Sequence, residues 1–148
     1  EKSHIDINKL LGQAKEQLEI KAREKNIRIS LENQAAKTEI YADYNRLMQV
    51  MLNIIENAIK FTPPAGLIKI IITNDEEYVK IAVEDTGMGI RTEDLPKIKT
   101  KFYKADLKTA GSGLGLAIAE EIVVLHGGKL DITSSLGEGT KATILLPF

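Results

Sequence analysis

The sequence predicts a single α/β domain in which helices and strands follow one another along 148 residues. Two stretches, 7–25 and 46–61, repeat apolar residues every three or four positions, which is typical of helices. Other stretches, such as 68–72 and 79–83, alternate apolar and polar residues, which is typical of half-buried strands. A chain of this length can bury one hydrophobic core, and it shows no internal repeat.

The composition is that of an ordinary globular protein, with 43% hydrophobic and 28% charged residues. A net charge of −1 gives no electrostatic reason to expect nucleic acid as a partner or direct contact with a membrane. The absence of cysteine excludes disulfides, thiolate metal sites and a cysteine nucleophile. The chain starts at Glu1 without a methionine, so we expect a piece of a longer protein, with residues 1–5 as a linker.

The first helix is expected to be capped by Ser3 or Asp6 and to end at Asn26. One face of this helix is apolar and the remainder is highly charged, which we interpret as a solvated face. The charged residues are Lys15, Glu16, Glu19, Lys21, Arg23, Glu24 and Lys25.

Alternation predicts a strand at 27–32 and a shorter strand at 38–42. Asp43 is a plausible cap for the central helix, 46–61. The segment 62–66 ends this helix, because it contains two prolines and a glycine.

The segment 91–112 is poor in apolar residues and rich in lysine, as a functional loop would be. A buried helix is expected at 114–125, ending at His126, followed by a closing hairpin of 129–134 and 140–146. The residues of this helix expected to be in register are Leu114, Ile118, Ile122 and Leu125.

The central helix has a narrow polar edge on an otherwise apolar cylinder, spanning a sector of roughly 120°. The edge consists of Arg46, Gln49, Asn53, Glu56, Asn57 and Lys60. The amides of Asn53 and Asn57 and the ammonium group of Lys60 lie on consecutive turns, where they can face a cation and an anion together. A metal-bound polyphosphate presents that combination, although a core helix with a solvated edge shows the same pattern.

Asp85 continues the apolar side of the strand 79–83, where a carboxylate is costly unless donors meet it. Gly87 and Gly89 follow and allow a close approach to the backbone. Such a carboxylate can accept a hydrogen bond from the exocyclic amine of a purine. An ordinary Asp-Gly turn is the alternative.

Three alternate glycines in 111–116 run directly into the predicted helix. Their N–H groups and the helix N-terminus suit a phosphate, although a flexible hinge explains them equally well. The lysines of the preceding loop could contact phosphates or simply be solvated. Neither His4 nor His126 belongs to a metal-binding cluster or a catalytic triad.

In this order, the motifs resemble the catalytic, ATP-binding domain of bacterial sensor histidine kinases, in the gyrase, chaperone, kinase and MutL ATPase superfamily. The resemblance covers about 6–148, and the four motifs together are far more specific than any one alone. The four motifs are the N box at 53–61, the first glycine box at 85–89, the F box at 101–104 and the second glycine box at 111–116. In addition, 137–140 match the family's usual terminal hairpin.

The resemblance implies that Asn57 ligates Mg²⁺, with Asn53 beside it, and that Lys60 contacts phosphate. Phe61 would form a wall of the nucleotide site, and Asp85 would accept from the adenine amino group. We also expect Glu56 and Asn57 to be the catalytic residues of this domain, Glu56 by polarising the attacking histidine and Asn57 through the metal. The implied nucleotide-binding residues are Asn53, Asn57, Lys60, Phe61, Asp85, Gly87, Gly89, Ile90, Lys101, Tyr103, Lys104, Gly111, Gly113, Leu114, Gly115, Leu116 and Thr140.

The implied fold is the Bergerat ATP-binding fold, a two-layer α/β sandwich with helices on one face of a mixed, mostly antiparallel sheet and an ATP lid at 91–112. The implied activity is binding of ATP with Mg²⁺ and transfer of the γ-phosphoryl group to a histidine on a separate dimerisation domain of the same parent. A response regulator would be an indirect partner. The family's phosphoacceptor motif is absent here, so we expect a monomer that does not phosphorylate itself, from the cytoplasmic part of a membrane-bound parent.

Three residues in and just before the F box depart from the family pattern. Lys99 and Thr100 stand where a phenylalanine and an acid are usual, and Lys104 stands where arginine is commoner. These departures leave open an alternative function, a nucleotide-gated interaction module without efficient phosphotransfer. ATP-driven clamps of the same superfamily are disfavoured because the lid is short.

Overall fold

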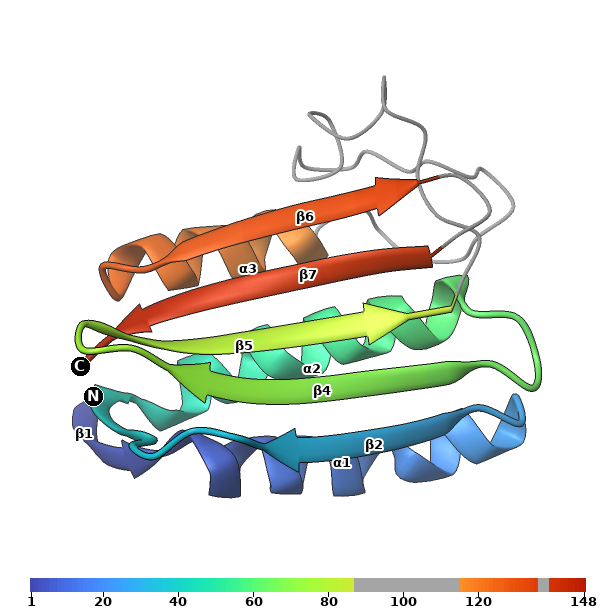
Figure 1. The fold of residues 1–148 in the computed structure, drawn as a ribbon, viewed down its shortest axis with the longest axis horizontal. Helices are drawn as coiled ribbons and strands as arrows, with labels where there is room; N and C mark the ends of the chain where they lie inside the picture. Colours follow the sequence, from blue (N-terminus) through green and yellow to red (C-terminus); the bar gives the residue numbers. More distant parts are fainter. Residues whose placement is uncertain (87–114, 136–138) are drawn as a thin grey trace.

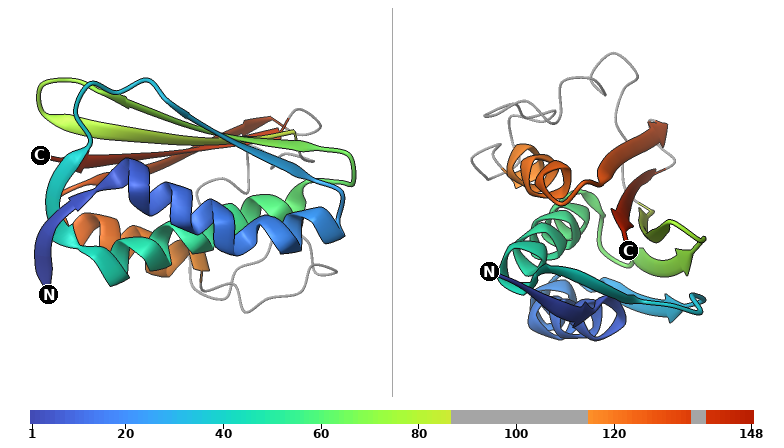
Figure 2. Two further views of the ribbon diagram at one scale, coloured as in Figure 1. Left: turned by 90° about the horizontal axis from the view of Figure 1, so that it is seen from below. Right: turned by 90° about the vertical axis from the view of Figure 1, so that its left-hand side faces the viewer.

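The computed structural model describes residues 1–86, 115–135 and 139–148, which form two layers. One layer is a five-stranded sheet, and the described helices pack against one of its faces (Figures 1 and 2). A smaller sheet of two strands lies beside the N-terminus. This arrangement confirms the predicted two-layer sandwich with helices on one face.

The elements follow one another along the chain as the alternating patterns predict, with 87–114 between β5 and α3. They are β1 Lys2–Asp6, α1 Ile7–Glu24, β2 Arg28–Asn33, β3 Glu39–Asp43, α2 Tyr44–Phe61, β4 Leu67–Asn74, β5 Tyr78–Asp85, α3 Gly115–Leu125, β6 Lys129–Ser135 and β7 Gly139–Pro147.

The large sheet has the strand order β2-β4-β5-β7-β6. Only the pair of β2 and β4 is parallel within it, and the other neighbours are antiparallel, so the sheet is mixed and mostly antiparallel as predicted. In the register of the central strand β5, Asp85 lies beside Ile68 of β4 and Thr140 of β7. The sheet therefore places Asp85 at the end of its middle strand, between two neighbours.

Aspartates cap the first two helices, as the sequence predicts. The Asp6 carboxylate accepts from the backbone N–H of Asn8 at 2.9 Å, and the Asp43 carboxylate accepts from that of Arg46 at 3.1 Å. Each bond satisfies one of the N–H groups that the first turn of a helix leaves unpaired. Asp6 rather than Ser3 is therefore the cap of α1.

The buried stripe of α2 determines how this helix is rotated against the sheet. Its members are Leu47, Val50, Met51, Ile54, Ile55, Ala58 and Ile59. They share one core with fully buried sheet residues such as Ile70, Ile81 and Ile144. Burying each large apolar side chain contributes about 1.5–3 kcal/mol, so rotating the helix out of this register is costly. The polar edge of α2 is thereby held away from the core.

The expectation that residues 1–5 form a linker is wrong. Lys2–Asp6 form the strand β1, which pairs antiparallel with β3 and places Ile5 opposite Ile40. Ile5 is only 8% exposed, and the burial of this one apolar residue in a polar stretch explains why the N-terminal segment is ordered against the domain.

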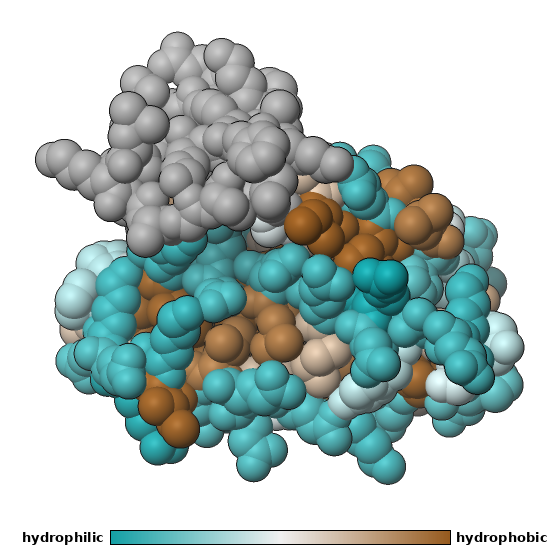
Figure 3. Space-filling view, turned by 180° about the vertical axis from the view of Figure 1, so that it is seen from behind, coloured by the Kyte–Doolittle hydropathy of each residue, from teal (hydrophilic) through white to brown (hydrophobic). Residues whose placement is uncertain are grey.

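The expectation that Leu125 is buried in α3 is also wrong, since its side chain is 80% exposed. The buried residues of α3 are Ala117, Ala119, Ile122 and Val123. Small side chains in this stripe let α3 lie close to α2, and Leu125 falls outside it. The helix-covered side of the molecule is mostly hydrophilic with separate apolar areas (Figure 3). Within the described ranges, none of the helices has both the length and the apolar character to cross a membrane.

Candidate functional site

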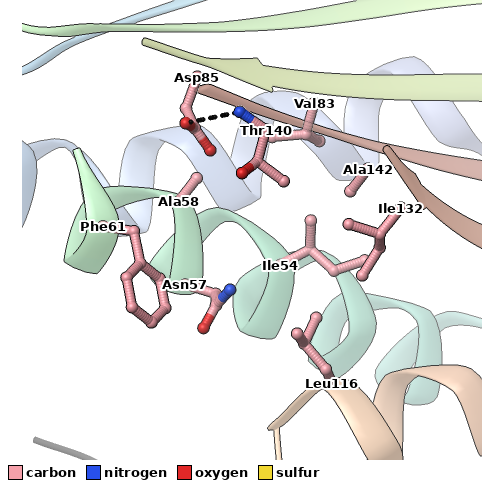
Figure 4. A pocket seen from close by; sticks show the side chains of 10 residues that line it. All are labelled: Ile54, Asn57, Ala58, Phe61, Val83, Asp85, Leu116, Ile132, Thr140 and Ala142. Carbon is pink, nitrogen blue, oxygen red and sulfur yellow. Dashed lines mark hydrogen bonds between the residues drawn. The ribbon is translucent and has the colours of Figure 1, made fainter. Parts of the chain in front are cut away.

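A cleft that is open to solvent lies between α2, the start of α3 and the strands β5, β6 and β7 (Figure 4). Its walls are mainly apolar, and the few polar groups come from α2, β5 and β7. The lining residues are Ile54, Asn57, Ala58, Phe61, Val83, Asp85, Leu116, Ile132, Thr140 and Ala142. An apolar cleft with a few convergent polar groups is the usual form of a small-molecule site.

The cleft brings together residues that the sequence predicts to share one ligand. Asn57 and Phe61 project from α2, and Asp85 and Thr140 come from the neighbouring strands β5 and β7 (Figure 4). Leu116 reaches the same cleft from the first turn of α3. Segments far apart in the chain therefore converge on one place.

Asp85 is half-buried at the end of β5, on the helix-facing side that its alternation predicts. The backbone N–H of Thr140 donates to Asp85 Oδ1 at 3.2 Å (Figure 4). A carboxylate in this position can also accept from an amine in the cleft, since an ionised carboxylate offers several lone pairs. Thr140 therefore helps to hold the carboxylate beside the cleft.

The polar edge of α2 meets the start of α3. The side-chain amide of Asn53 donates to the backbone carbonyl of Gly115 at 3.3 Å. A methyl group placed on Gly115 would lie 3.9 Å from the Asn53 side chain, in ordinary van der Waals contact. The last glycine of the second glycine box thus lies against the N box, as one shared ligand requires.

Glu56 and Lys60 lie on the polar edge of α2 but do not line the cleft. Glu56 Oε1 is 2.6 Å from Lys21 Nζ of α1, in an ion pair whose side chains are 42% and 56% exposed. Lys60 is half-buried. The catalytic role expected of Glu56 stays a prediction, and its partner in the structure is a lysine of the neighbouring helix.

The interpretation of Lys25 as part of a solvated face is wrong. Its side chain is half-buried, and Nζ donates to the backbone carbonyls of Ile59 at 3.0 Å and Lys60 at 2.9 Å. The physical reason is that the last carbonyls of a helix lack intrahelical partners and carry partial negative charge, which attracts a cation.

His126 connects the end of α3 to the start of α2. Its Nδ1 lies 2.8 Å from the carbonyl of Ile122, and its Nε2 accepts from the backbone N–H of Asp43 at 3.2 Å. Both partners are satisfied when the proton is on Nδ1, a tautomer that we infer from these contacts. His126 therefore caps the end of α3 and joins it to the start of α2.

Several predicted site residues lie outside the described residues, as does the whole segment 91–112, which is expected to form the ATP lid and contains Lys99 and Thr100. They are Gly87, Gly89, Ile90, Lys101, Tyr103, Lys104, Gly111, Gly113 and Leu114. Sequence reasoning assigned Val83, Ile132 and Ala142 only to strands, and they are part of the cleft wall. The signal that could have found them is their position, because they continue the helix-facing side of strands that end at the cleft.

The comparisons with known proteins agree with this geometry. Residues 42–148 match the family described as histidine kinase-, DNA gyrase B- and HSP90-like ATPases. The chain is 39% identical over 125 residues to the sensor histidine kinase RppB of Synechocystis sp., covering 80% of this chain and 28% of RppB. The chain thus spans less than a third of that relative.

Solved structures extend the likeness over the whole chain. The catalytic domain of the histidine kinase ThkA matches with a TM-score of 0.88 and 30% identity, covering 99% of this chain and 97% of the other. Full-length ShkA in complex with AMPPNP matches with a TM-score of 0.90 and 33% identity, covering 99% of this chain and 31% of ShkA. The fold is therefore the Bergerat fold of histidine kinase catalytic domains.

The chain belongs to the family of histidine kinase-, DNA gyrase B- and HSP90-like ATPases. Within that family it is an ATP-binding catalytic domain of the sensor histidine kinase type.

Proposed function

We propose that the domain binds Mg-ATP in the cleft and donates the γ-phosphoryl group to a histidine on a separate dimerisation domain of its parent. The observation that supports this most is the convergence of Asn57, Phe61 and Asp85 on one cleft from separate elements. Across the site, Asp85 offers an acceptor for the adenine amine, Phe61 a flat apolar wall, and Asn57 an amide for the phosphate end.

At the base end, the Asp85 carboxylate accepts the adenine amino group while its Oδ1 keeps the bond to the Thr140 N–H. Phe61, half-buried at the end of α2, packs against the base or sugar. Gly87 and Gly89 allow the purine to come close. Once the base fills the cleft, the mainly apolar walls leave less water around it, which strengthens the hydrogen bonds made there.

The phosphate end lies along the polar edge of α2. Lys60 binds phosphate, and the glycines of 111–116 wrap around it, with Leu114 and Leu116 beside them. Ile90 and the F box residues Lys101, Tyr103 and Lys104 contact the nucleotide from the lid side. Together these cations neutralise charge that develops during transfer, so that this domain's part in the reaction is positioning and electrostatic stabilisation.

The residues present suit a magnesium ion. Mg²⁺ takes one or two oxygen ligands from the protein and the remainder from phosphate and water, so it needs no dedicated cage. In the described residues no cluster of three or more His, Cys, Asp or Glu side chains exists. Asn57, assisted by Asn53, would hold the ion, which supplies charge neutralisation at the phosphates.

The acceptor histidine and the response regulator are proposed partners outside this chain. Glu56 would polarise the acceptor histidine, in which case its ion pair with Lys21 must open or Lys21 must follow it. ThkA has been solved in complex with the response regulator TrrA, over a match of 28% identity and TM-score 0.84 that covers 99% of this chain and 41% of ThkA. That structure supports a response regulator as the indirect partner of this domain.

The test of binding is a titration with ATP, with and without Mg²⁺, of the wild type and Asp85→Asn. The amide keeps an acceptor for Thr140 but loses the charge, and a bond to a charged group contributes about 1.5–3 kcal/mol, so binding should weaken about tenfold or more. Asp75→Asn, in the β4–β5 turn at the other end of the sheet, is the matched control. Equal affinity of the wild type and Asp85→Asn would contradict the proposed base site.

The test of transfer adds the purified acceptor domain and ATP labelled on the γ-phosphate. Label on the acceptor supports the kinase function. Tight nucleotide binding without any transfer would contradict it and favour the alternative, a nucleotide-gated interaction module.

A further inference from the structure

The nucleotide-binding end of α2 is held from the end of α1 through its backbone carbonyls, and not through the side chains that we propose bind the nucleotide. The last residues of α2 carry Asn57, Lys60 and Phe61, and their carbonyls need partners outside the helix. The Thr62 hydroxyl donates to the carbonyl of Ala58 at 2.7 Å, and Lys25 Nζ takes the carbonyls of Ile59 and Lys60. Lys25 thus serves two of the last four carbonyls of the helix.

The position of these two carbonyls matters because they belong to the peptide groups on either side of Lys60. Fixing them sets the direction in which Lys60 and Phe61 leave the helix, and Phe61 lines the cleft. The contact is charge-assisted, half-buried and aligned with the negative end of the helix dipole, which are the conditions that make such a bond strong. Lys21, one turn earlier, pairs with Glu56 in an exposed contact that contributes little.

The turns that follow the two helices are bonded to each other as well. The backbone N–H of Ala65 donates to the carbonyl of Asn26 at 2.9 Å, and that of Arg28 donates to the carbonyl of Gly66 at 3.2 Å. Asn26 and Ala65 have φ values of 58° and 72°, an unusual conformation for residues other than glycine. Such conformations persist only where the surroundings hold them.

This connection continues to the opposite wall of the cleft. The backbone N–H of Leu67 donates to the Thr86 hydroxyl at 3.0 Å, and the N–H of Thr86 donates to the carbonyl of Leu67 at 3.2 Å. Thr86 directly follows Asp85. The end of α1 is therefore linked both to the α2 wall and to the strand that carries the purine acceptor.

We infer that Lys25 is a positioning residue for the nucleotide site, which holds the last turn of α2 so that Lys60 and Phe61 face the bound nucleotide. This inference rests on the proposed binding of ATP in the cleft. Lys25 itself lies outside the cleft lining. It acts through Lys60, whose carbonyl it binds, and through Phe61, the next residue in the helix.

The first experiment measures the dissociation constant for Mg-ATP in Lys25→Met, which keeps most of the aliphatic stem and removes the ammonium group. Loss of a charge-assisted contact to two carbonyls should weaken binding about tenfold. Lys25→Arg, which restores the charge and the donors, should bind within about twofold of the wild type. Lys15→Met is the matched control, because Lys15 Nζ pairs within α1 with Glu19 at 3.1 Å.

A purely stabilising role must be separated from positioning. Asp6→Ala removes the cap at the other end of α1 and serves as a destabilised reference. ATP binding by Lys25→Met and Asp6→Ala is measured under conditions in which urea titration shows both variants to be fully folded. If Lys25→Met weakens binding no more than Asp6→Ala does, the inference is overturned. Should Lys25→Met fail to fold, Lys25→Gln keeps one donor without the charge and is expected to show the same direction of change.

A double-mutant cycle with Phe61→Leu identifies the route of the effect. Since Lys25 acts on the turn that carries Phe61, the loss caused by Lys25→Met should shrink to about threefold or less in the Phe61→Leu background, as coupled residues behave. Strictly additive losses would overturn the inference. If the wild type binds no ATP, the proposed function fails. If the wild type and Lys25→Met bind ATP equally well, only the inference about Lys25 fails.

Discussion

Asn53 and Gly115, 62 residues apart in the sequence, are joined by a 3.3 Å hydrogen bond from the Asn53 amide to the Gly115 carbonyl. The bond connects the polar edge of α2 to the first residue of α3, next to Leu116 in the cleft wall. It is the direct contact between the two sequence motifs that a single triphosphate would have to bridge.

Replacing Asn53 by alanine should therefore affect both the fold and the site. We expect unfolding free energy to fall by about 1 kcal/mol, the net contribution of one hydrogen bond, and ATP affinity to fall with it. Urea unfolding and nucleotide titration measure the two effects. The control is Asn74→Ala, which removes bonds to the backbone N–H groups of Ala36 and Lys37, outside the cleft. A variant of Asn53 that binds ATP as the wild type does would contradict the role given to this edge.

His126→Phe tests the link between α3 and α2. Phenylalanine keeps a ring of similar size but leaves the N–H of Asp43 without its acceptor, and we expect a loss of about 1–2 kcal/mol in unfolding free energy. Thermal or urea unfolding measures it. His4→Phe is the control, because His4 is exposed and only stacks edge-on against Tyr41. Equal losses of unfolding free energy in His126→Phe and His4→Phe would show that the hydrogen bonds of His126 do not stabilise the fold.

The cap of α1 should make stability depend on pH in the acid range. Burial raises the pKa of Asp6, whereas hydrogen bonds from the Thr38 hydroxyl and the N–H of Asn8 lower it. The hydrogen bonds outweigh burial, so the pKa lies below its ordinary value of 3.8. A lowered folded-state pKa adds stability above about pH 3.8, and this contribution is lost as pH falls through the folded-state value.

Asp6→Ala should accordingly cost about 1 kcal/mol at neutral pH, the usual value of a lost cap, and the difference from the wild type should shrink below pH 3.8. Urea unfolding across the acid range measures this difference. Asp6→Asn keeps an acceptor that does not titrate, so its loss should be smaller at neutral pH and should fall on acidification by about as much as that of Asp6→Ala, because only the wild-type carboxylate titrates. A difference between wild type and Asp6→Ala that grows on acidification would refute this assignment.

Substitutions at the neighbouring residues Ala65 and Gly66 should change the free energy of unfolding in opposite directions. Ala65→Gly relieves a φ of 72° and should raise unfolding free energy by roughly 0.5 kcal/mol, after the greater chain entropy of glycine is subtracted. Gly66→Ala should lower it by about 1–3 kcal/mol, because the new methyl group would lie 2.2 Å from the Thr62 side chain and 2.9 Å from the Pro63 carbonyl.

Differential scanning calorimetry of both variants measures these effects. Thr62 cannot easily give way, since it is fully buried and its hydroxyl is bonded to the carbonyl of Ala58. A stabilised Gly66→Ala protein would mean that this turn can move, and that the connection between α1 and α2 is looser than the structure has it.

The sequence by itself determined the family and all the described elements except β1. Capping by Asp6 and Asp43, the alternation that turns Asp85 toward the helices and the polar edge of α2 are local patterns, and a local pattern can be read without knowing its neighbours. The order of the motifs then identified the family that the comparisons confirm.

Only the tertiary structure decided which residues meet. The pairing of β1 with β3, the bonds of Lys25 to the end of α2 and the contact of His126 with Asp43 join segments far apart in the chain. The sequence pattern around a lysine on a charged helical face is the same whether the lysine faces water or the end of a neighbouring helix. Its partner is set by how the helices pack on the sheet, and that packing depends on the shape of the whole core.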